Sequence, residues 1–243
     1  MTATVDLPTP DRALAIGAHP DDIEFGAGAT LAKWAAAGCE VALLVCTDGS
    51  KGTWDPGADL GALVVRRQGE QVDAAAVLGA ATEVVFLGYT DGELESGSEP
   101  RKEIAGWIRR LRPEVLLGHD PWKRYRLHPD HRHAGLLTVD GLVAARDPHF
   151  FPDLGLDHHR PETLLLFEAD EPDHVEAVVG YEQVKIDALE AHRSQFESTM
   201  GITASDDGGE QAAFRRRVVD DLAEHGALGE VELGEAFKRI DDI

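Results

Sequence analysis

Two short segments of this 243-residue chain each place imidazoles beside carboxylates. The first is His19-Pro20-Asp21-Asp22 and the second is His128-Pro129-Asp130-His131. Two imidazoles and one carboxylate, with one coordination position left open, form a known catalytic arrangement for Zn²⁺. His19, Asp22 and His131 would supply that set of ligands.

Asp21 and His128 remain outside this ligand set, where they are available for acid–base chemistry. A metal ion lowers the pKa of its water toward about 7, and a neighbouring carboxylate can accept the proton. An imidazole on the other side can protonate a leaving amine or stabilise an oxyanion. The pattern predicts a metal-dependent hydrolase that removes an acyl group from an amide nitrogen.

Each segment also has a simpler interpretation. The first is compatible with a turn in which an aspartate caps the next helix, and the second with a helix that has proline near its first position. The same ligand types suit non-haem Fe(II), so Fe²⁺ and an oxygenase activity stay open. A non-catalytic metal-binding protein is a further alternative, against which the spare carboxylate of Asp21 argues.

The elements that must position these residues follow from the apolar pattern. Near-continuous apolar runs predict strands over 13–18, 40–46, 83–87, 114–118 and 163–167. Helices are expected over 28–37, 60–78, 101–111, 131–145 and 184–194, with one charged helix and a short Val-Glu-Leu segment in the last thirty residues. This alternation predicts an α/β fold, a Rossmann-like open and mostly parallel sheet with helices on both faces, in one domain spanning 1–243.

Ligands of open α/β sheets bind outside the carboxyl ends of the strands. The strand over 13–18 delivers the first segment to that edge, and the strand over 114–118 delivers His119, followed by the second segment. We therefore expect the metal site at the carboxyl ends of the strands. His119 is a candidate for contact with the metal ligands or for a structural role, and His192, on a late helix, for packing.

The composition of the chain argues against two kinds of binding partner. A formal net charge of −22 argues against nucleic acid and against adsorption to an anionic membrane surface. No apolar run reaches the length of a membrane span, and the N-terminus lacks the pattern of a signal peptide. The two cysteines, Cys39 and Cys46, do not have the spacing of a disulfide framework, which favours free buried thiols in the cytoplasm.

The two segments together resemble those of the PIG-L/LmbE-type deacetylases, which include N-acetylglucosaminyl-phosphatidylinositol deacetylases and deacetylases of the mycothiol and bacillithiol pathways. The resemblance runs from Ala18 to about Gln195. Weaker matches lie between and after the two segments: Thr47-Asp48-Gly49, Arg67-Gln68-Gly69-Glu70, Leu87-Gly88 with Asp91-Gly92, and Lys185, Ala188-Leu189, His192 and Ser194-Gln195.

This resemblance implies Zn²⁺ held by His19, Asp22 and His131, with Asp21 as general base. It also implies His128 as the electrostatic or general-acid partner, Asp130 as the residue that orients His128, and Arg67 as a substrate-binding residue. One position departs from the family. Some thiol-pathway members carry a tyrosine two residues before the second segment, where this chain has Arg126, which we expect to contact substrate.

The expected substrate is a small-molecule amide, an N-acetylated amino sugar or glycoconjugate. The alternative is an amidase that cleaves a thiol–sugar conjugate or a natural-product intermediate. The resemblance also implies a homo-oligomer, for which the loops around Trp54 and over 146–161 are candidate contacts.

Overall fold

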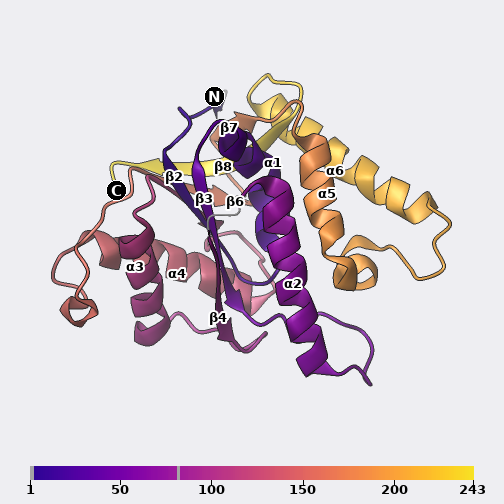
Figure 1. Cartoon of the computed structure of the whole chain (residues 1–243). Coiled ribbons are helices and arrows are strands. Elements are labelled where there is room, and N and C mark those ends of the chain that lie inside the picture. Colours follow the sequence, from indigo (N-terminus) through magenta and orange to yellow (C-terminus); the bar gives the residue numbers. More distant parts are fainter. Residues whose placement is uncertain (1–2, 81–82) are drawn as a thin grey trace.

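A twisted, mostly parallel sheet forms the centre of the computed structural model, which describes residues 3–80 and 83–243 (Figure 1). Within these residues the sheet has eight strands in the order β1-β7-β8-β6-β5-β2-β3-β4. Only β8 runs antiparallel to its neighbours, β6 and β7. The strands are β1 (Thr4–Val5), β2 (Arg12–Gly17), β3 (Glu40–Thr47), β4 (Glu83–Tyr89), β5 (Val115–His119), β6 (Thr163–Phe167), β7 (His174–Ala177) and β8 (Gly234–Asp241).

The strand order reverses direction between β2 and β5. The chain proceeds from β2 to β3 and β4 on one side, then returns to place β5 on the other side of β2. Such a switch point opens a crevice at the carboxyl ends of the two strands, because their following connections leave toward opposite faces. Here the crevice lies between the residues that follow β2 and those that follow β5.

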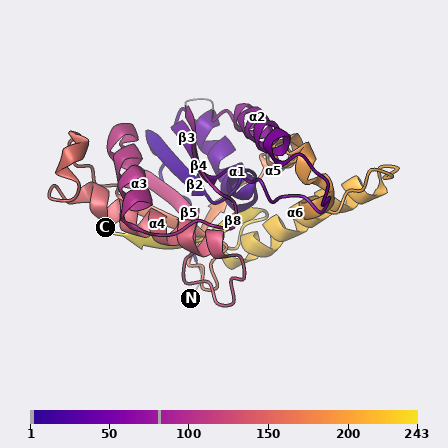
Figure 2. The ribbon, with the colours of Figure 1, turned by 90° about the horizontal axis from the view of Figure 1, so that it is seen from below.

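Helices cover both faces of the sheet, as the alternating side chains of the strands require. Leu14 and Ile16 face α3 (Ser98–Leu111) and α4 (Pro129–Arg146), whereas Ala13 and Ala15 face α1 (Asp22–Ala36), α2 (Leu60–Leu78) and α5 (Glu182–Ala191). The last helix, α6 (Gly209–Leu228), packs beside α5 and against β7 and β8. Figure 2 shows α3 and α4 on one side of the sheet and α2, α5 and α6 on the other.

The predicted α/β class with a mostly parallel sheet is confirmed, and all five predicted strands are present. The predicted helix over 28–37 begins earlier, at Asp22, and the late helix ends at Ala191 before a 3₁₀ turn (Arg193–Gln195) and a π-helical turn, η3 (Phe196–Met200). Strands β1, β7 and β8 were missed. Strands β1 and β7 are short, and β8 carries several charged side chains, so none of the three appears in the sequence as an apolar run.

The predictions about the cysteines and about membrane-spanning segments can both be compared with the described residues. Cys39 and Cys46 are both free and buried, as predicted. None of the described helices combines the length and apolar character that crossing a bilayer requires.

Candidate active site

The turn after β2 carries the first candidate segment. The backbone N–H of His19 donates to Oδ2 of Asp22 at 2.7 Å, which closes the turn before α1. Asp21 adopts φ 102°, a conformation that aspartate and asparagine tolerate better than most residues. Arg67 of α2 stabilises the turn from outside, donating to the carbonyl of Pro20 at 2.6 Å. The turn interpretation is therefore correct for the backbone, but the side chain of Asp21 does not cap α1.

The second segment begins α4. Pro129 is its first residue, so Asp130 and His131 lie in the first turn, beside the end of β5. Gly135 permits this close approach: a Cβ atom there would lie 2.6 Å from the carbonyl oxygen of His119. The helix-start interpretation thus describes the local structure, and it also explains how His131 reaches the residues that follow β2.

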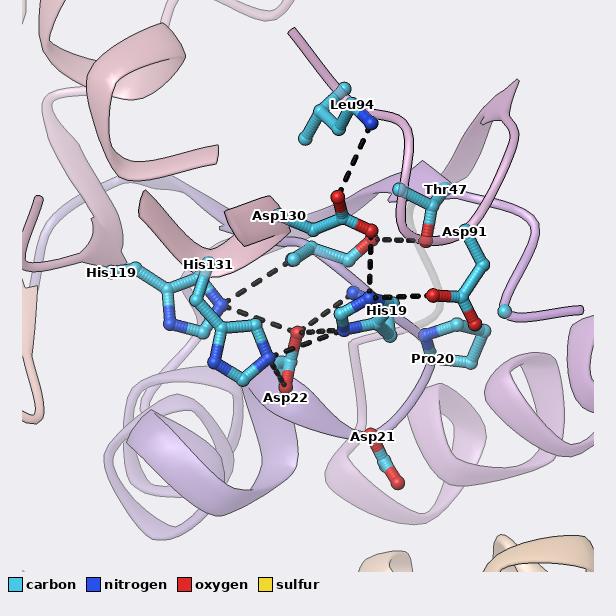
Figure 3. A network of polar contacts seen from close by, with 12 residues as sticks. His19, Pro20, Asp21, Asp22, Thr47, Asp91, Leu94, His119, Asp130 and His131 are labelled. Carbon is cyan, nitrogen blue, oxygen red and sulfur yellow. Dashed lines mark hydrogen bonds and ion pairs between the residues drawn. The ribbon is translucent and has the colours of Figure 1, made fainter. Parts of the chain in front are cut away.

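The three expected metal ligands converge in this crevice. Nδ1 of His19 lies 3.3 Å from a carboxylate oxygen of Asp22 and 3.2 Å from Nε2 of His131. Nε2 of His131 lies 3.3 Å from the other oxygen of Asp22. Ligands about 2.0–2.1 Å from a tetrahedral zinc ion are separated by about 3.3 Å, so the spacing of these three side chains fits that geometry. Figure 3 shows Asp22 and His131 on the same side of the His19 ring.

The other side of the His19 ring faces two carboxylates. Nε2 of His19 lies 3.1 Å from Asp130 and 3.2 Å from Asp91 (Figure 3). Asp130 also accepts the backbone N–H groups of Gly92 at 2.6 Å and Leu94 at 3.2 Å. The resemblance implies that Asp130 orients His128, and that role stays a prediction. In the structure the Asp130 carboxylate contacts His19, whose Nδ1 faces Asp22.

Charges in the crevice compensate one another. Burial alone would raise the pKa of the Asp22 carboxyl, but His131 and His119 hold that pKa well below its ordinary value. Burial would lower the pKa of His19, but the carboxylates of Asp130, Asp22 and Asp91 raise it well above its ordinary value. The crevice thus holds a compact group of carboxylates and imidazoles that could bind a metal ion.

His119, the last residue of β5, also contacts Asp22. Its Nε2 lies 3.2 Å from Asp22 and its Nδ1 lies 3.0 Å from Glu168. Glu168 follows β6 directly, with φ 57°, and sequence reasoning missed it. The available signal was its position, since a polar residue at the end of a buried strand reaches the same edge as the other two segments.

Arg126 lies behind the site and does not line it. Its Nη1 atom donates to Nδ1 of His131 at 2.9 Å and to Glu168 at 2.6 Å, and its side chain is 7% exposed. The expectation that Arg126 contacts substrate is therefore not supported by its position. It belongs instead to a partly exposed network that joins His131 to Glu168 and His119.

Asp21 stands apart from the ligand cluster, with no contact drawn to it in Figure 3. Its side chain is 7% exposed and lies 3.7 Å from the guanidinium of Arg67. Its backbone N–H donates to the side chain of Gln71. Burial raises the pKa of Asp21 to about 6, against the opposing charge of Arg67.

A hollow of about 280 Å³ opens over these residues. Asp21, Asp22, His19, His131, Arg67, Asp91 and His128 are among the residues that line it. The ring of His128 is exposed and stands edge-on to His19, with 4.6 Å between ring centroids. Arg67 directs two nitrogen atoms to the carbonyls of Pro20 and Gly49, while its Nε has no partner among the described residues.

Other combinations of ligand atoms also converge in this crevice. Three such groups occur among the described residues: His19 with His128 and His131, His19 with Asp91, His128 and Asp130, and Asp22 with His119 and His131. His192 is fully buried, with its Nε2 3.5 Å from Glu24 beneath the turn, so it packs rather than lines the hollow.

Comparison with known proteins decides the family. The pattern that defines PIG-L (GlcNAc-PI de-N-acetylase) matches residues 14–141, more than half of the chain. The chain belongs to the PIG-L family. The matched region runs from β2 into α4 and so contains both candidate segments, and the predicted resemblance is confirmed.

Among curated members of the family, the chain is 38% identical over 188 residues to diacetylchitobiose deacetylase of Thermococcus kodakarensis, a match that covers 76% of this chain and 70% of that protein. It is 36% identical over 175 residues to 1D-myo-inositol 2-acetamido-2-deoxy-alpha-D-glucopyranoside deacetylase of Streptomyces avermitilis, covering 62% of this chain and 58% of the relative.

A solved PIG-L structure shares the fold over nearly the whole chain. It is N,N'-diacetylchitobiose deacetylase from Pyrococcus horikoshii complexed with its inhibitor MPG. The TM-score is 0.85 and the identity 28%, covering 96% of this chain and 84% of that one. The relatives named are deacetylases of N-acetylated amino sugars, so the family evidence agrees with the amide hydrolysis predicted from the two segments.

Proposed function

We propose that this chain hydrolyses the N-acetyl group of an amino sugar or glycoconjugate, using a metal ion held by His19, Asp22 and His131. The observation that carries the proposal is that Nδ1 of His19 and Nε2 of His131 lie 3.2 Å apart and that each lies 3.3 Å from one of the two carboxylate oxygens of Asp22. The activities of the relatives support the choice of bond, and the spare carboxylate of Asp21 supports catalysis over simple metal storage.

Zinc fits this donor set best. Two imidazole nitrogens and one carboxylate oxygen, spaced for a tetrahedron, are a common catalytic zinc site, and Fe²⁺ shares the same ligand types. When bound, Zn²⁺ would lower the pKa of water and polarise the carbonyl oxygen of the substrate. Asp130 and Asp91 would act through His19 as positioning residues, since their contacts fix its ring with Nδ1 toward Asp22.

Asp21 acts as the general base. It lines the hollow, and its carboxylate contacts none of the three proposed ligands, so it is available to take a proton from the attacking water. Water adds to the acyl carbon, the carbon–nitrogen bond breaks, and acetate and the free amine leave. The pKa of about 6 that burial gives Asp21 leaves it ionised at neutral pH.

His128 lies on the exposed side of the hollow, where a substrate carbonyl oxygen or leaving nitrogen would arrive. Its imidazole donates a hydrogen bond to the developing oxyanion or a proton to the amine. Arg67 can offer its unpartnered Nε to a polar substrate, although its two other donors stabilise the turn at Pro20 and the loop at Gly49.

The test is acetate release from N-acetylglucosamine derivatives by protein of measured metal content. We expect release with zinc, loss on chelation and recovery when zinc is restored. A substrate panel that includes thiol–sugar conjugates separates the amino-sugar deacetylase from the alternative amidase. Zinc-loaded protein that releases acetate from no member of the panel would contradict the proposal and favour the metal-binding alternative, and oxygen consumption with iron would favour an oxygenase.

Two further expectations accompany the proposal. Free buried cysteines are compatible with action in the cytoplasm. The homo-oligomer that the resemblance implies stays a proposal, with the loops around Trp54, whose side chain is 78% exposed, and over 146–161 as candidate contacts. Light scattering of the purified protein, with Trp54→Ser as the variant, tests the proposed homo-oligomer.

A further inference from the structure

The turn that carries Asp21 is held by two side chains of α2. Arg67 and Gln71 lie four residues apart on this helix and therefore share one face of it. Arg67 donates to the carbonyl of Pro20 at 2.6 Å, and the backbone N–H of Asp21 donates to Oε1 of Gln71 at 3.1 Å. This carbonyl and this N–H belong to one planar peptide unit. Both ends of that unit are therefore fixed by α2.

The fixed peptide unit accounts for the backbone conformation of Asp21. Its φ of 102° lies outside the ranges that residues with side chains normally adopt, and such a conformation costs about 1–3 kcal/mol. It persists only where the surroundings over-determine it. If the peptide unit turned over, Arg67 would lose its acceptor, and the carbonyl of Pro20 would face the amide oxygen of Gln71. The contacts from α2 thus hold Asp21 in a conformation that the turn alone disfavours.

The side-chain amide of Gln71 has one orientation that satisfies its surroundings. Its Nε2 donates to Oε1 of Glu24 at 2.6 Å. A carboxylate accepts hydrogen bonds and does not donate them, so the NH₂ group faces Glu24 and the carbonyl oxygen faces the N–H of Asp21. Turning the amide over would set oxygen against oxygen and NH₂ against N–H. Glu24 therefore determines which atom Gln71 offers to Asp21.

Glu24 is held on its other side by His192. Both side chains are fully buried, and Nε2 of His192 lies 3.5 Å from Oε2 of Glu24. Burial would lower the pKa of His192, but the Glu24 carboxylate raises that pKa above its ordinary value. Replacing a buried ion pair with apolar side chains is often neutral or stabilising, so stability alone does not account for these two charges. Their contact fixes one oxygen of Glu24 and leaves the other for Gln71.

This chain of buried contacts ends at the residue that serves as base in the proposed reaction. We propose that Gln71, oriented by Glu24, is a positioning residue for Asp21 and keeps the carboxylate of Asp21 at the hollow. The hydrogen bond goes to the backbone of Asp21. A hydrogen bond to the carboxylate itself would favour its charged form and make it a weaker base. The role rests on the proposed function of Asp21, but the backbone contact can be measured without turnover.

The first test is Gln71→Met, which keeps the length of the side chain and removes both of its hydrogen bonds. On zinc-loaded protein we expect kcat for acetate release from N-acetylglucosamine to fall about 10–100-fold, the cost of a small displacement of a catalytic group. KM and zinc affinity should stay unchanged, because Gln71 is not among the described residues that line the hollow. A kcat within about twofold of the wild type would overturn the role.

The matched control is His174→Met, at another fully buried side chain. His174 contacts the buried carboxylate of Glu176 at 2.9 Å and the hydroxyl of Thr4 at 2.8 Å, in β7 and β1 at one edge of the sheet. This variant should lose stability in urea titration and keep its kcat and KM. An equal loss of kcat in His174→Met and Gln71→Met would show that general loss of stability causes both.

A positioning residue also differs from a structural one in its dependence on Asp21. In an Asp21→Asn background the base is already absent, so Gln71→Met should lower the remaining kcat by less than about twofold. The same fold-loss of kcat in both backgrounds would overturn the positioning role and leave Gln71 as a structural residue.

Exchanging the two polar groups provides a rescue test. Gln71→Glu places two carboxylates together at the contact with Glu24, so kcat should fall at least as far as in Gln71→Met. Adding Glu24→Gln restores a donor at that contact, and the carboxylate at position 71 can still accept the N–H of Asp21. The double variant should recover most of the lost kcat. A double variant no faster than Gln71→Glu would overturn the proposal, and this pair decides the question if Gln71→Met does not fold.

Failure of the proposed function has a different signature, because hydrogen exchange of the Asp21 amide proton, followed by NMR, reports the backbone contact without turnover. We expect faster exchange in Gln71→Met and wild-type exchange in His174→Met. If the wild-type protein releases no acetate while this exchange still responds to Gln71→Met, the contact stands and the deacetylase proposal fails. Acetate release with unchanged kcat in Gln71→Met leaves the deacetylase proposal standing and removes the positioning role.

Discussion

Replacing Asp21 with asparagine tests the division of labour within the candidate site. The amide keeps the shape of the side chain and removes its capacity to accept a proton. Asparagine also suits the backbone, because Asp21 has φ 102° and asparagine adopts positive φ more readily than alanine. The three proposed ligands make no contact with the Asp21 carboxylate, so zinc content should stay at the wild-type level.

The expected loss follows from the surroundings of Asp21. A general base contributes about 10²–10⁴ to turnover, or about 2.7–5.5 kcal/mol at 1.36 kcal/mol per factor of ten. Among the described residues that line the hollow, the two other carboxylates, Asp22 and Asp91, lie within 3.3 Å of a histidine nitrogen. Neither is free to replace the base, so we expect kcat to fall by about 10³–10⁴.

The assay measures kcat for acetate release at saturating zinc, together with metal content and zinc affinity by competition with a chelator. Asp91→Asn is the matched control, since it is the same substitution at a buried aspartate of the same hollow. Its contact with Nε2 of His19 predicts a weaker affinity for zinc, by about 10–100-fold, with kcat at saturating zinc largely kept. Asp21→Asn protein that binds zinc normally and retains more than a tenth of the wild-type kcat would refute the role of Asp21 as base. Loss of zinc from that variant would mean that Asp21 is a ligand.

Three further predictions concern the network around the site. Arg67→Met should lower the free energy of unfolding by about 3 kcal/mol in urea titration, because it leaves two buried carbonyl groups without a donor; an unchanged midpoint would contradict this. Arg126→Gln should raise zinc affinity about tenfold in chelator competition. If His131 binds zinc through Nε2, its ring hydrogen must be on Nδ1, and this N–H then faces the N–H donor of Arg126, which is unfavourable. Weaker affinity in the variant would show that Arg126 supports the ligand. Lys185→Met should cost about 3 kcal/mol in the same urea titration, since Glu235 stays buried without its cation, and Lys185→Arg should recover part of the loss.

Apolar runs were sufficient to predict the central strands of the fold. Strands β2, β3, β5 and β6 are buried on both faces, so each appears in the sequence as an uninterrupted apolar segment. By contrast, β8 contains Lys238, Arg239 and Asp241, and its place in the sheet depends on pairing with two strands distant in sequence. The start of α1 was missed because Gly26 and Gly28 weaken the helical pattern, although Gly26 is required where the ring of Phe167 packs on the helix.

The site was predictable in its residue types and less so in its contacts. The positions of His19 and His131 at the ends of neighbouring elements follow from the strand order of an open sheet. The partner of Asp130 does not, because its hydrogen bond to His19 spans 111 residues and depends on the side-chain rotamers at both ends. Arg126 illustrates the same limit: a long flexible side chain next to a site can turn toward it or behind it, and here it turns behind His131.

The antiparallel strand β8 has a consequence for the order in which the chain can fold. It lies between β6 and β7, and β1 reaches the sheet only through β7. Strands β2 to β6 can therefore pair as soon as they leave the ribosome, whereas β7 and β1 must wait for residues 234–241. Until then the edge of β6 is open and apolar, the kind of strand edge that recruits other chains. We therefore expect an interval during synthesis in which the proposed metal ligands are already together while one edge of the sheet is exposed to aggregation.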